Sequence, residues 1–120
     1  PSIGIGQPGC TAWEPAFGQD LEWTLLHALS RLGRPGGESA YFRLSTRPID
    51  QALAGDPGDE RRRLVLAGGY PVRRAKGRPR VTLAGMGAVM PEVIEAAEAL
   101  GDQVVRAQQT GIRGPRKDHR

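Results

Sequence analysis

The sequence predicts an α/β fold that consists of two partial parallel-sheet units, joined by a linker and followed by a disordered basic C-terminal tail. Two patterns lead to this prediction. An amphipathic helix pattern over 15–32 is followed by a turn and a short apolar strand at 39–45. A buried strand at 81–87 is followed by a glycine turn, a helix over 91–100 and the start of another strand at 103–106. Strands that alternate with helices are typical of a parallel sheet.

The first helix is the element around which we expect the rest of the chain to pack. Its apolar residues recur at spacings of three and four, which places them on one face. This stripe consists of Phe17, Leu21, Leu25, Ala28 and Leu32, and Leu29 widens it. Pro15 suits the first turn, where a missing N–H costs nothing, and Gly33 suits a left-handed stop. Glu14 and Asp20 place negative charge near the positive end of the helix dipole.

The middle of the chain is expected to hold short elements separated by turns. Residues 1–13 are glycine-rich and indicate an extended lead-in, and 48–53 could form one or two helical turns. The polar, turn-rich stretch 55–63 is the clearest linker. A strand is expected at 64–67. It is followed by an edge segment at 70–74, where a proline is tolerated because one side of an edge strand is unpaired.

The helix over 91–100 is the best-marked element of the second half. Pro91 suits its first turn, and Gly101 suits its end. The residues expected to share its apolar face are Val93, Ala96, Ala97 and Leu100. Beyond this helix and the strand start that follows it, the periodicity disappears. Residues 107–120 are therefore expected to form the disordered basic tail.

Composition limits the class of protein. The 120 residues suffice for one domain of ordinary size, and 38% hydrophobic residues with 17 glycines and 10 prolines indicate a thin core with much loop. A single cysteine excludes an internal disulfide framework, and one cysteine with two histidines cannot form a Cys/His zinc site. No apolar run approaches the ~18 residues of a membrane span and no signal-peptide pattern is present, so a cytoplasmic protein is expected. The start at Pro1 indicates a processed or truncated product.

The net charge of +4 hides a difference between the two halves. Residues 1–60 hold four arginines against eight acids, a net −4, whereas 61–120 hold thirteen Lys and Arg against five acids, a net +8. A basic half is typical of proteins that bind nucleic acid or another polyanion. The basic clusters lie at Arg61–Arg63, Arg73–Lys76, Arg78 and Arg116–Lys117. They lack interleaved aromatic residues and a recognition helix, so nucleic acid is not the expected partner. A small basic nucleic-acid- or partner-binding protein without catalysis is the alternative function.

Two segments of the chain resemble one enzyme family. Pro8-Gly-Cys-Thr-Ala-Trp-Glu-Pro-Ala-Phe17, the helix after it and Ala40-Tyr-Phe-Arg-Leu-Ser45 resemble the end of the pyrimidine-binding domain of thiamine-diphosphate enzymes. Gly68-Gly-Tyr70, Val81-Thr-Leu-Ala-Gly-Met-Gly87 and the alanine-rich helix are similar to the start of the transketolase C-terminal domain. The most similar member is the single-chain decarboxylating component of bacterial pyruvate dehydrogenase, with transketolase next. The resemblance spans residues 1–106, and the order and separation of the two segments carry it.

The resemblance implies a domain organisation and an activity. Residues 1–54 would be the C-terminal part of the pyrimidine-binding domain, 55–63 the linker, and 64–106 the start of the C-terminal domain. The implied activity is pyruvate decarboxylation and acetyl transfer by a 2-oxo acid dehydrogenase, or the activity of a transketolase. The implied cofactors of the parent enzyme are thiamine diphosphate and Mg. Its implied partners are a second copy in a homodimer and the other components of the 2-oxo acid dehydrogenase complex.

By the same resemblance, the chain is a fragment of an enzyme. The family's Gly-Asp-Gly…Asn metal-diphosphate signature has no match in this sequence. The carboxylate that activates the cofactor's aminopyrimidine ring would belong to the front of the pyrimidine-binding domain, which this sequence lacks by the resemblance. We therefore expect no catalytic, cofactor-binding or metal-binding residue here, no cofactor bound to this chain alone, and no turnover by it. Truncation or a shifted reading frame would produce the change of character at 107–120.

Arg47 is the candidate substrate-facing residue. In transketolases, a Ser-Arg-Gln loop near this place presents an arginine to a substrate phosphate, and Ser45-Thr-Arg47 resembles that loop. The match departs from the family, because the spacing differs by one residue and no glutamine follows. The histidine that pyruvate-specific relatives carry near this loop has no counterpart between Gly33 and Leu100. The alternative interpretation is a surface arginine beside a helix.

Other residues with possible chemistry have simpler interpretations. Gly85-Met-Gly87 before a helix could hold an anion, but a strand-to-helix turn is the favoured interpretation. His27 lies away from the apolar stripe and is expected to be exposed, so no Ser-His-Asp set is indicated. Trp13 and Trp23 are expected at the edge of the core rather than at a domain interface.

Overall fold

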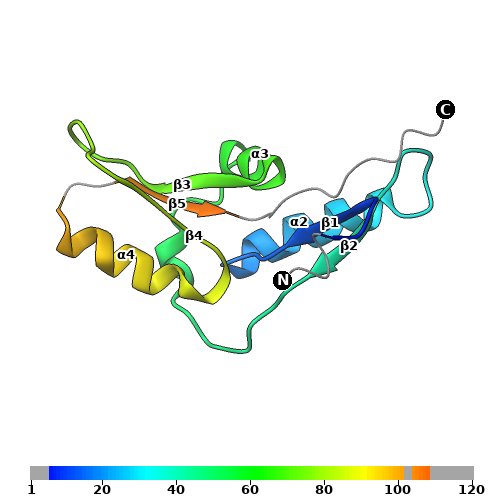
Figure 1. The fold of residues 1–120 in the computed structure, drawn as a ribbon, viewed down its shortest axis with the longest axis horizontal. Coiled ribbons are helices and arrows are strands. Elements are labelled where there is room, and N and C mark those ends of the chain that lie inside the picture. Colours follow the sequence, from blue (N-terminus) through cyan, green and yellow to red (C-terminus); the bar gives the residue numbers. More distant parts are fainter. Residues whose placement is uncertain (1–5, 102–103, 109–120) are drawn as a thin grey trace.

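The computed structural model describes residues 6–101 and 104–108, and it has the predicted α/β fold (Figure 1). The strands are β1 (Cys10–Trp13), β2 (Ser39–Phe42), β3 (Gly69–Arg73), β4 (Thr82–Gly85) and β5 (Val104–Gln108). The helices are α2 (Gly18–Arg31), α3 (Asp59–Ala67) and α4 (Met90–Ala99), with short 3-10 turns η1 (Gln51–Ala54) and η2 (Gly87–Val89). Strands β1 and β2 form one sheet, and a second sheet has the order β3-β5-β4.

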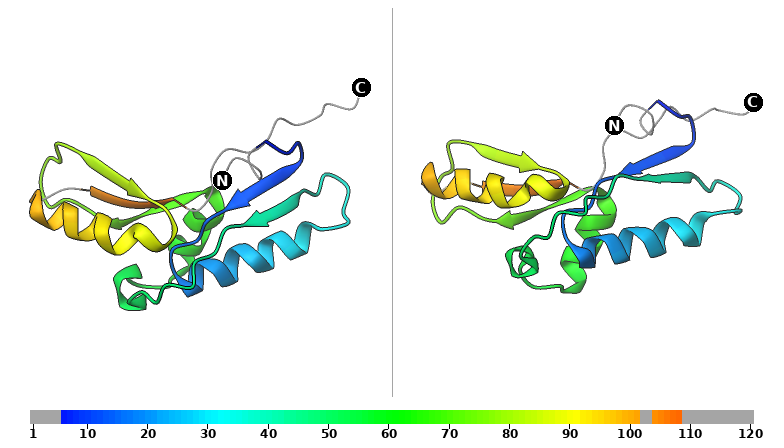
Figure 2. Two further views of the ribbon diagram at one scale, coloured as in Figure 1. Left: turned by 60° about the horizontal axis from the view of Figure 1, so that its bottom comes forward. Right: turned by 90° about the horizontal axis from the view of Figure 1, so that it is seen from below.

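The first unit is a parallel strand–helix–strand arrangement. Strands β1 and β2 pair in parallel, with Thr11 opposite Ala40 and Trp13 opposite Phe42, and α2 connects them. Figure 2 shows α2 running alongside both strands. The lead-in predicted at 1–13 therefore contains a paired strand, and β2 ends at Phe42, earlier than the predicted 45.

Helix α2 buries a different face from the predicted one. Leucines of the expected stripe are about half exposed, as Leu29 is at 54%. The fully buried residues of α2 are instead Asp20 and Thr24, with Ala28 one turn further. The Thr24 hydroxyl donates to the Asp20 carbonyl oxygen at 2.7 Å, so its burial leaves no polar atom unsatisfied. The prediction of an amphipathic helix is confirmed, and Phe17 and Ala28 of the predicted stripe are buried. The buried face is nevertheless rotated from the predicted one, because Leu25, Leu29 and Leu32 are exposed.

The second unit is also built on a parallel strand–helix–strand arrangement, as predicted. Strands β4 and β5 are parallel and α4 connects them, while β3 adds an antiparallel edge that carries Pro71. The tail predicted from 107 begins too early, because Ala107 lies in β5, pairs with Tyr70 and Gly85, and is fully buried. The rest of the predicted tail, residues 109–120, lies outside the described residues.

The predicted linker at 55–63 and strand at 64–67 are wrong in their local structure. Helix α3 covers both from Asp59 onward, which shortens the extended part of the connection. The negative charges of Asp59 and Glu60 lie in the first turn, where they interact favourably with the positive end of the helix dipole. Gly68 ends the helix in a left-handed conformation with φ of 117°. Val65 is fully buried and attaches α3 to the core.

The hydrophobic core lies mainly in the second unit. Met90, Val65 and Val105 are fully buried at its centre, and Ala16 and Phe17 extend it toward the first unit. On α4 the buried residues are Met90, Ile94 and Ala97, so the predicted face is rotated. Ala96 and Leu100, which were expected on that face, are exposed.

Candidate functional site

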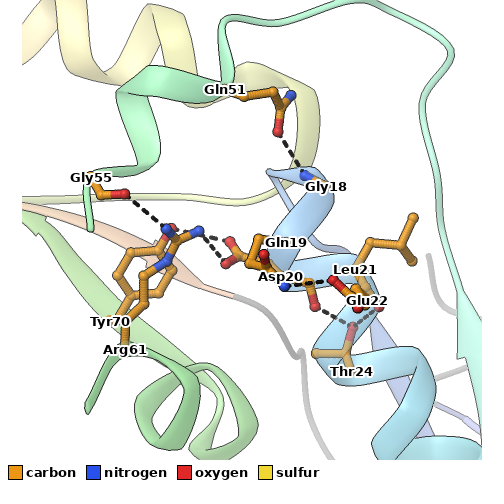
Figure 3. Close-up of polar contacts among 10 residues, drawn as sticks. All are labelled: Gly18, Gln19, Asp20, Leu21, Glu22, Thr24, Gln51, Gly55, Arg61 and Tyr70. Carbon is orange, nitrogen blue, oxygen red and sulfur yellow. Dashed lines mark hydrogen bonds and ion pairs between the residues drawn. The ribbon is translucent and has the colours of Figure 1, made fainter. Parts of the chain in front are cut away.

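A buried ionic network joins the two units (Figure 3). It consists of Asp20 on α2, Arg61 on α3 and Tyr70 on β3, which are 0%, 8% and 2% exposed. Arg61 Nη2 donates to Asp20 Oδ1 at 2.6 Å, and the Tyr70 hydroxyl donates to Asp20 Oδ2 at 3.1 Å. The second terminal nitrogen of Arg61, Nη1, donates to the Gly55 carbonyl oxygen at 3.2 Å. Both carboxylate oxygens are therefore engaged.

Aromatic rings surround the guanidinium of Arg61. Its central carbon lies 4.9 Å from the ring centroid of Tyr70 and 5.4 Å from that of Trp23. The Phe17 ring follows at 6.0 Å. These distances are within the range of cation–π attraction, which strengthens when water is excluded. Arg61 Nε is also buried and has no hydrogen-bond partner in the described part of the chain. The arginine is held by one carboxylate, one carbonyl and aromatic faces.

The network keeps Tyr70 protonated. Burial raises the pKa of the Tyr70 hydroxyl far above its ordinary value of 10.0, and the neighbouring Asp20 carboxylate raises it further. The Arg61 charge acts in the opposite direction and only partly offsets these two causes. None of the three side chains lines the two hollows described next. The arrangement is thus suited to holding elements together rather than to proton transfer.

A hollow of about 200 Å³ lies where the start of α2 meets the segment after β2. We call it the junction hollow. Its lining residues are Pro15, Ala16, Phe17, Gly18, Leu21, Leu44, Ser45, Arg47, Ile49, Gln51 and Ala88. Gln51 Oε1 accepts a hydrogen bond of 2.8 Å from the backbone N–H of Gly18, which satisfies a donor at the first turn of α2.

The structure places Arg47 at this junction hollow, with its side chain about half exposed. Its guanidinium is an ion-pair partner of Glu92 on α4 and donates to the Ala88 carbonyl oxygen at 3.3 Å. The hydrogen bond from Arg47 lowers the pKa of the Glu92 carboxyl, so this acid stays ionised over a wider pH range. Arg47 thus connects the first unit to the start of α4 at the surface.

A second hollow of about 270 Å³ lies between α2 and the β1–β2 sheet. Its ionisable lining residues are His27, Arg31 and Glu38. The Thr11 hydroxyl donates to Glu38 Oε2 at 2.6 Å. His27 is half-buried rather than exposed, because its ring stands edge-on to Trp13 with centroids 6.3 Å apart. The expectation of an exposed histidine is therefore wrong. Trp13 is buried but lies outside the main core cluster, whereas Trp23 packs against that cluster at its edge, as expected.

The glycine turn before α4 packs against the first unit. The backbone N–H of Gly87 donates to the Glu14 carbonyl oxygen at 3.2 Å. A side chain at Gly87 would place its Cβ 2.8 Å from Glu14 Oε1, and φ is +57°, so only glycine fits without strain. The turn amide is already engaged, which agrees with a strand-to-helix turn and not with an anion site.

Neither a metal site nor a membrane helix is found in the described ranges. They contain no group of three or more His, Cys, Asp or Glu placed to hold a metal ion. No helix within them has the length and apolar character needed to cross a bilayer. No family model matches the chain, and no curated protein matches it. The resemblance to thiamine-diphosphate enzymes therefore remains a prediction.

Proposed function

We propose that the chain is a segment of a cytoplasmic thiamine-diphosphate-dependent 2-oxo acid dehydrogenase that acts on pyruvate, with transketolase as the other candidate of the family. One observation carries this proposal. The two family-like segments occur in the family's order, and each includes part of a parallel strand–helix–strand unit, one spanning Cys10–Phe42 and the other Thr82–Gln108. The resemblance implies that the first unit ends one domain and that the second unit begins the next, with a connecting segment between them.

The contacts between the units give further support. Asp20 belongs to the first segment, whereas its partners Arg61 and Tyr70 belong to the connection and to the second segment. Arg47 makes a second link, at the surface, to Glu92. Neighbouring domains of one enzyme would need such contacts, because the catalytic geometry depends on a fixed arrangement of domains.

The described residues do not fit the cofactor itself. A magnesium diphosphate needs several oxygen ligands, but both carboxylate oxygens of Asp20 are taken by Arg61 and Tyr70. Glu14, near the end of β1, pairs with Arg43 at 3.5 Å. We therefore assign no reaction step to these residues. In the proposed enzyme the cofactor would supply the carbanion chemistry, and this segment would help to fix the domains that hold it.

Reading the encoding gene through both flanks, in all three frames, tests the proposal. We expect an upstream frame to encode the Gly-Asp-Gly…Asn signature, and a downstream frame to continue the strands and helices of the C-terminal domain. Flanks that encode neither would contradict the proposal. Calorimetric titration of the 120-residue chain with thiamine diphosphate and magnesium is expected to give no heat of binding. Micromolar binding would contradict the assignment of the cofactor site to other parts of the enzyme.

Two arginines of the basic clusters have acidic partners, which weakens the nucleic-acid alternative. Arg61 is buried against Asp20, and Arg73 on β3 forms an ion pair with Glu98 on α4. These two arginines already have acidic partners, so they offer less charge to a phosphate backbone than the sequence indicates. We therefore advance no second function.

A further inference from the structure

The hollow between α2 and the β1–β2 sheet is lined by opposite charges that do not neutralise each other. We call it the sheet hollow, and its volume is about 270 Å³. Arg31, in the last turn of α2, and Glu38, directly before β2, both line it. No ion pair joins these two described residues to each other. An acid and a base that line one hollow without pairing favour a ligand that carries a counter-charge for each.

The turn after α2 and the first strand hold both charged groups in place. Arg31 Nη2 donates to the Gly36 carbonyl oxygen at 2.8 Å. A Cβ at Gly37 would stand 2.0 Å from the Arg31 carbonyl oxygen, so only glycine lets the turn pack this closely on the end of α2. The Thr11 hydroxyl, on β1, donates to Glu38 Oε2 at 2.6 Å, and Thr11 is 5% exposed. Both groups are therefore positioned before a ligand binds, which lowers the entropic cost of binding.

Both charged groups have the capacity to bind a ligand in addition to these contacts. A guanidinium has several N–H donors in a planar fork, and the Gly36 carbonyl oxygen engages Nη2. This fork matches the geometry of a carboxylate. A carboxylate can accept several hydrogen bonds, so Glu38 can accept from an ammonium group as well as from the Thr11 hydroxyl.

The lining also separates the two kinds of polar group by element. His27 lies one turn before Arg31 on the same side of α2 and lines the hollow too. Helix α2, which runs alongside both strands in Figure 2, thus contributes the groups suited to a carboxylate, whereas Glu38 stands at the start of β2. Apolar side chains complete the lining: Trp13, Ala28, Ala40 and Leu66.

We propose that the sheet hollow binds a small aliphatic amino acid as its zwitterion, with the carboxylate of the ligand on Arg31 and its ammonium group on Glu38. A ligand with only one of these groups would leave one charge of the hollow without a partner and would meet a like charge. The volume lies just below the range of about 300–1,000 Å³ that is typical of sites for drug-sized ligands, so a small ligand fits. The proposal goes beyond the proposed enzymatic function and does not depend on it.

Titration of the full 120-residue chain with matched probes, followed by amide NMR shifts, tests the proposal. Glycine and L-valine are the zwitterions, 3-methylbutanoate is valine without the ammonium group, and isobutylamine is valine without the carboxylate. We expect at least one zwitterion to saturate below about 20 mM, with shifts at 11–13, 27–31 and 38–40. Each single-charge analogue should bind at least about tenfold more weakly than L-valine. Absence of saturation by both zwitterions, shifts confined to other residues, or equal binding of the analogues would overturn the proposal.

Glu38→Gln tests the assignment of the ammonium group. The variant keeps an acceptor for the Thr11 hydroxyl and removes only the charge. It should weaken the binding of L-valine and strengthen that of 3-methylbutanoate, so the preference for L-valine should fall about tenfold or more. A merely structural role of Glu38 would weaken both probes alike, and that result would overturn the proposal.

Arg31→Gln tests the assignment of the carboxylate and is expected to weaken the binding of L-valine about tenfold or more. Arg34→Gln is the control, because Arg34 is an exposed arginine of the following turn that does not line the hollow. This control should leave binding unchanged. Equal effects of the two variants would indicate unspecific charge attraction and would overturn the proposal. If Arg31→Gln fails to fold, the comparison of probes on Glu38→Gln still decides.

Discussion

The two strand–helix–strand units bury their helices in different ways. Helix α4 packs against its sheet with apolar side chains, of which Met90 and Ile94 are almost completely buried. Helix α2 buries a carboxylate and a hydroxyl, Asp20 and Thr24, beside the small Ala28, and it leaves Leu25, Leu26 and Leu29 about half exposed. Within the described residues, the second unit also has a third strand, β3, whereas the first has two.

This difference indicates how each unit is stabilised. The apolar contacts of α4 are made within its own unit, so the second unit contains most of its own core. A two-stranded sheet is only marginally stable alone. The first unit reaches the core through Ala16 and Phe17, and it depends in addition on Arg61 and Tyr70, which lie outside it and satisfy the charge of Asp20. The central claim of this account is that the buried network attaches the first unit to the second.

The largest expected effect is that of breaking the network. Asp20→Asn should lower the free energy of unfolding by about 3–5 kcal/mol, because it leaves the Arg61 charge buried without a counter-ion. Chemical denaturation measures this. Glu22→Gln is the control, since Glu22 is an exposed acid on the same helix, and it should change stability little. The double variant Asp20→Leu/Arg61→Met should lose much less than Asp20→Asn alone, because it removes both charges. If the double variant loses as much stability as Asp20→Asn does, the result would contradict the account.

A second pair of variants compares the two helices directly. Ile94→Ala on α4 should cost about 2–5 kcal/mol, because it opens a cavity in the core. Leu29→Ala on α2 should cost no more than about 0.5 kcal/mol, because Leu29 is 54% exposed. Thermal or urea unfolding at a dilution where the chain is monomeric provides the measurement. Similar losses for the two variants would remove the distinction between the units.

Tyr70 should give the network an alkaline limit. The pKa of its hydroxyl is raised in the folded chain. The contribution of Tyr70 to the free energy of unfolding is therefore fully present below pH 10.0, the ordinary pKa, and is lost as the pH rises from there through the raised value. Tyr70→Phe should cost about 1.5–3 kcal/mol at neutral pH, since it removes a hydrogen bond to a charged group. Unfolding followed as a function of pH should show a weaker alkaline decline in Tyr70→Phe than in the unchanged chain. Parallel pH profiles would argue against a buried neutral hydroxyl.

The surface link should contribute least. The pKa of Glu92 is lowered in the folded chain. The contribution of Glu92 to stability is therefore present above pH 4.5, the ordinary pKa, and is lost as the pH falls through the lower pKa of the folded chain. The Arg47–Glu92 pair is exposed, and exposed pairs are weak. Melting temperatures of Glu92→Gln and the unchanged chain should therefore differ slightly at neutral pH and converge in acid. A difference that grows in acid would contradict this assignment.

Local patterns were sufficient to predict the elements whose causes are local. Apolar spacing and end residues located α2 and α4 to within a few residues, and the order of patterns predicted the parallel strands. Strand β1 was missed because its pairing with β2 is not local and its surroundings are rich in glycine. Helix α3 was missed because it begins with charged residues that are typical of a linker. Its attachment to the core depends on contacts distant in sequence.

The network was missed for a related physical reason. Asp20 suits the first turn of a helix, so its sequence position has a sufficient local explanation without a buried partner. The partner, Arg61, is 41 residues away and is one of three consecutive arginines, of which Arg62 and Arg63 are exposed. One signal was present, since Phe17, Asp20, Thr24 and Ala28 recur at spacings of three and four, as the leucines do. Two competing stripes on one helix leave its orientation to tertiary contacts.

Amide hydrogen exchange of the unchanged chain and of Asp20→Asn, compared element by element, tests the central claim most directly. The account predicts that Asp20→Asn lowers protection in β1, α2 and β2, while α4 and β5 keep most of theirs, because only the first unit depends on the network for its attachment. A uniform loss of protection across both units, or an unchanged α2, would contradict it.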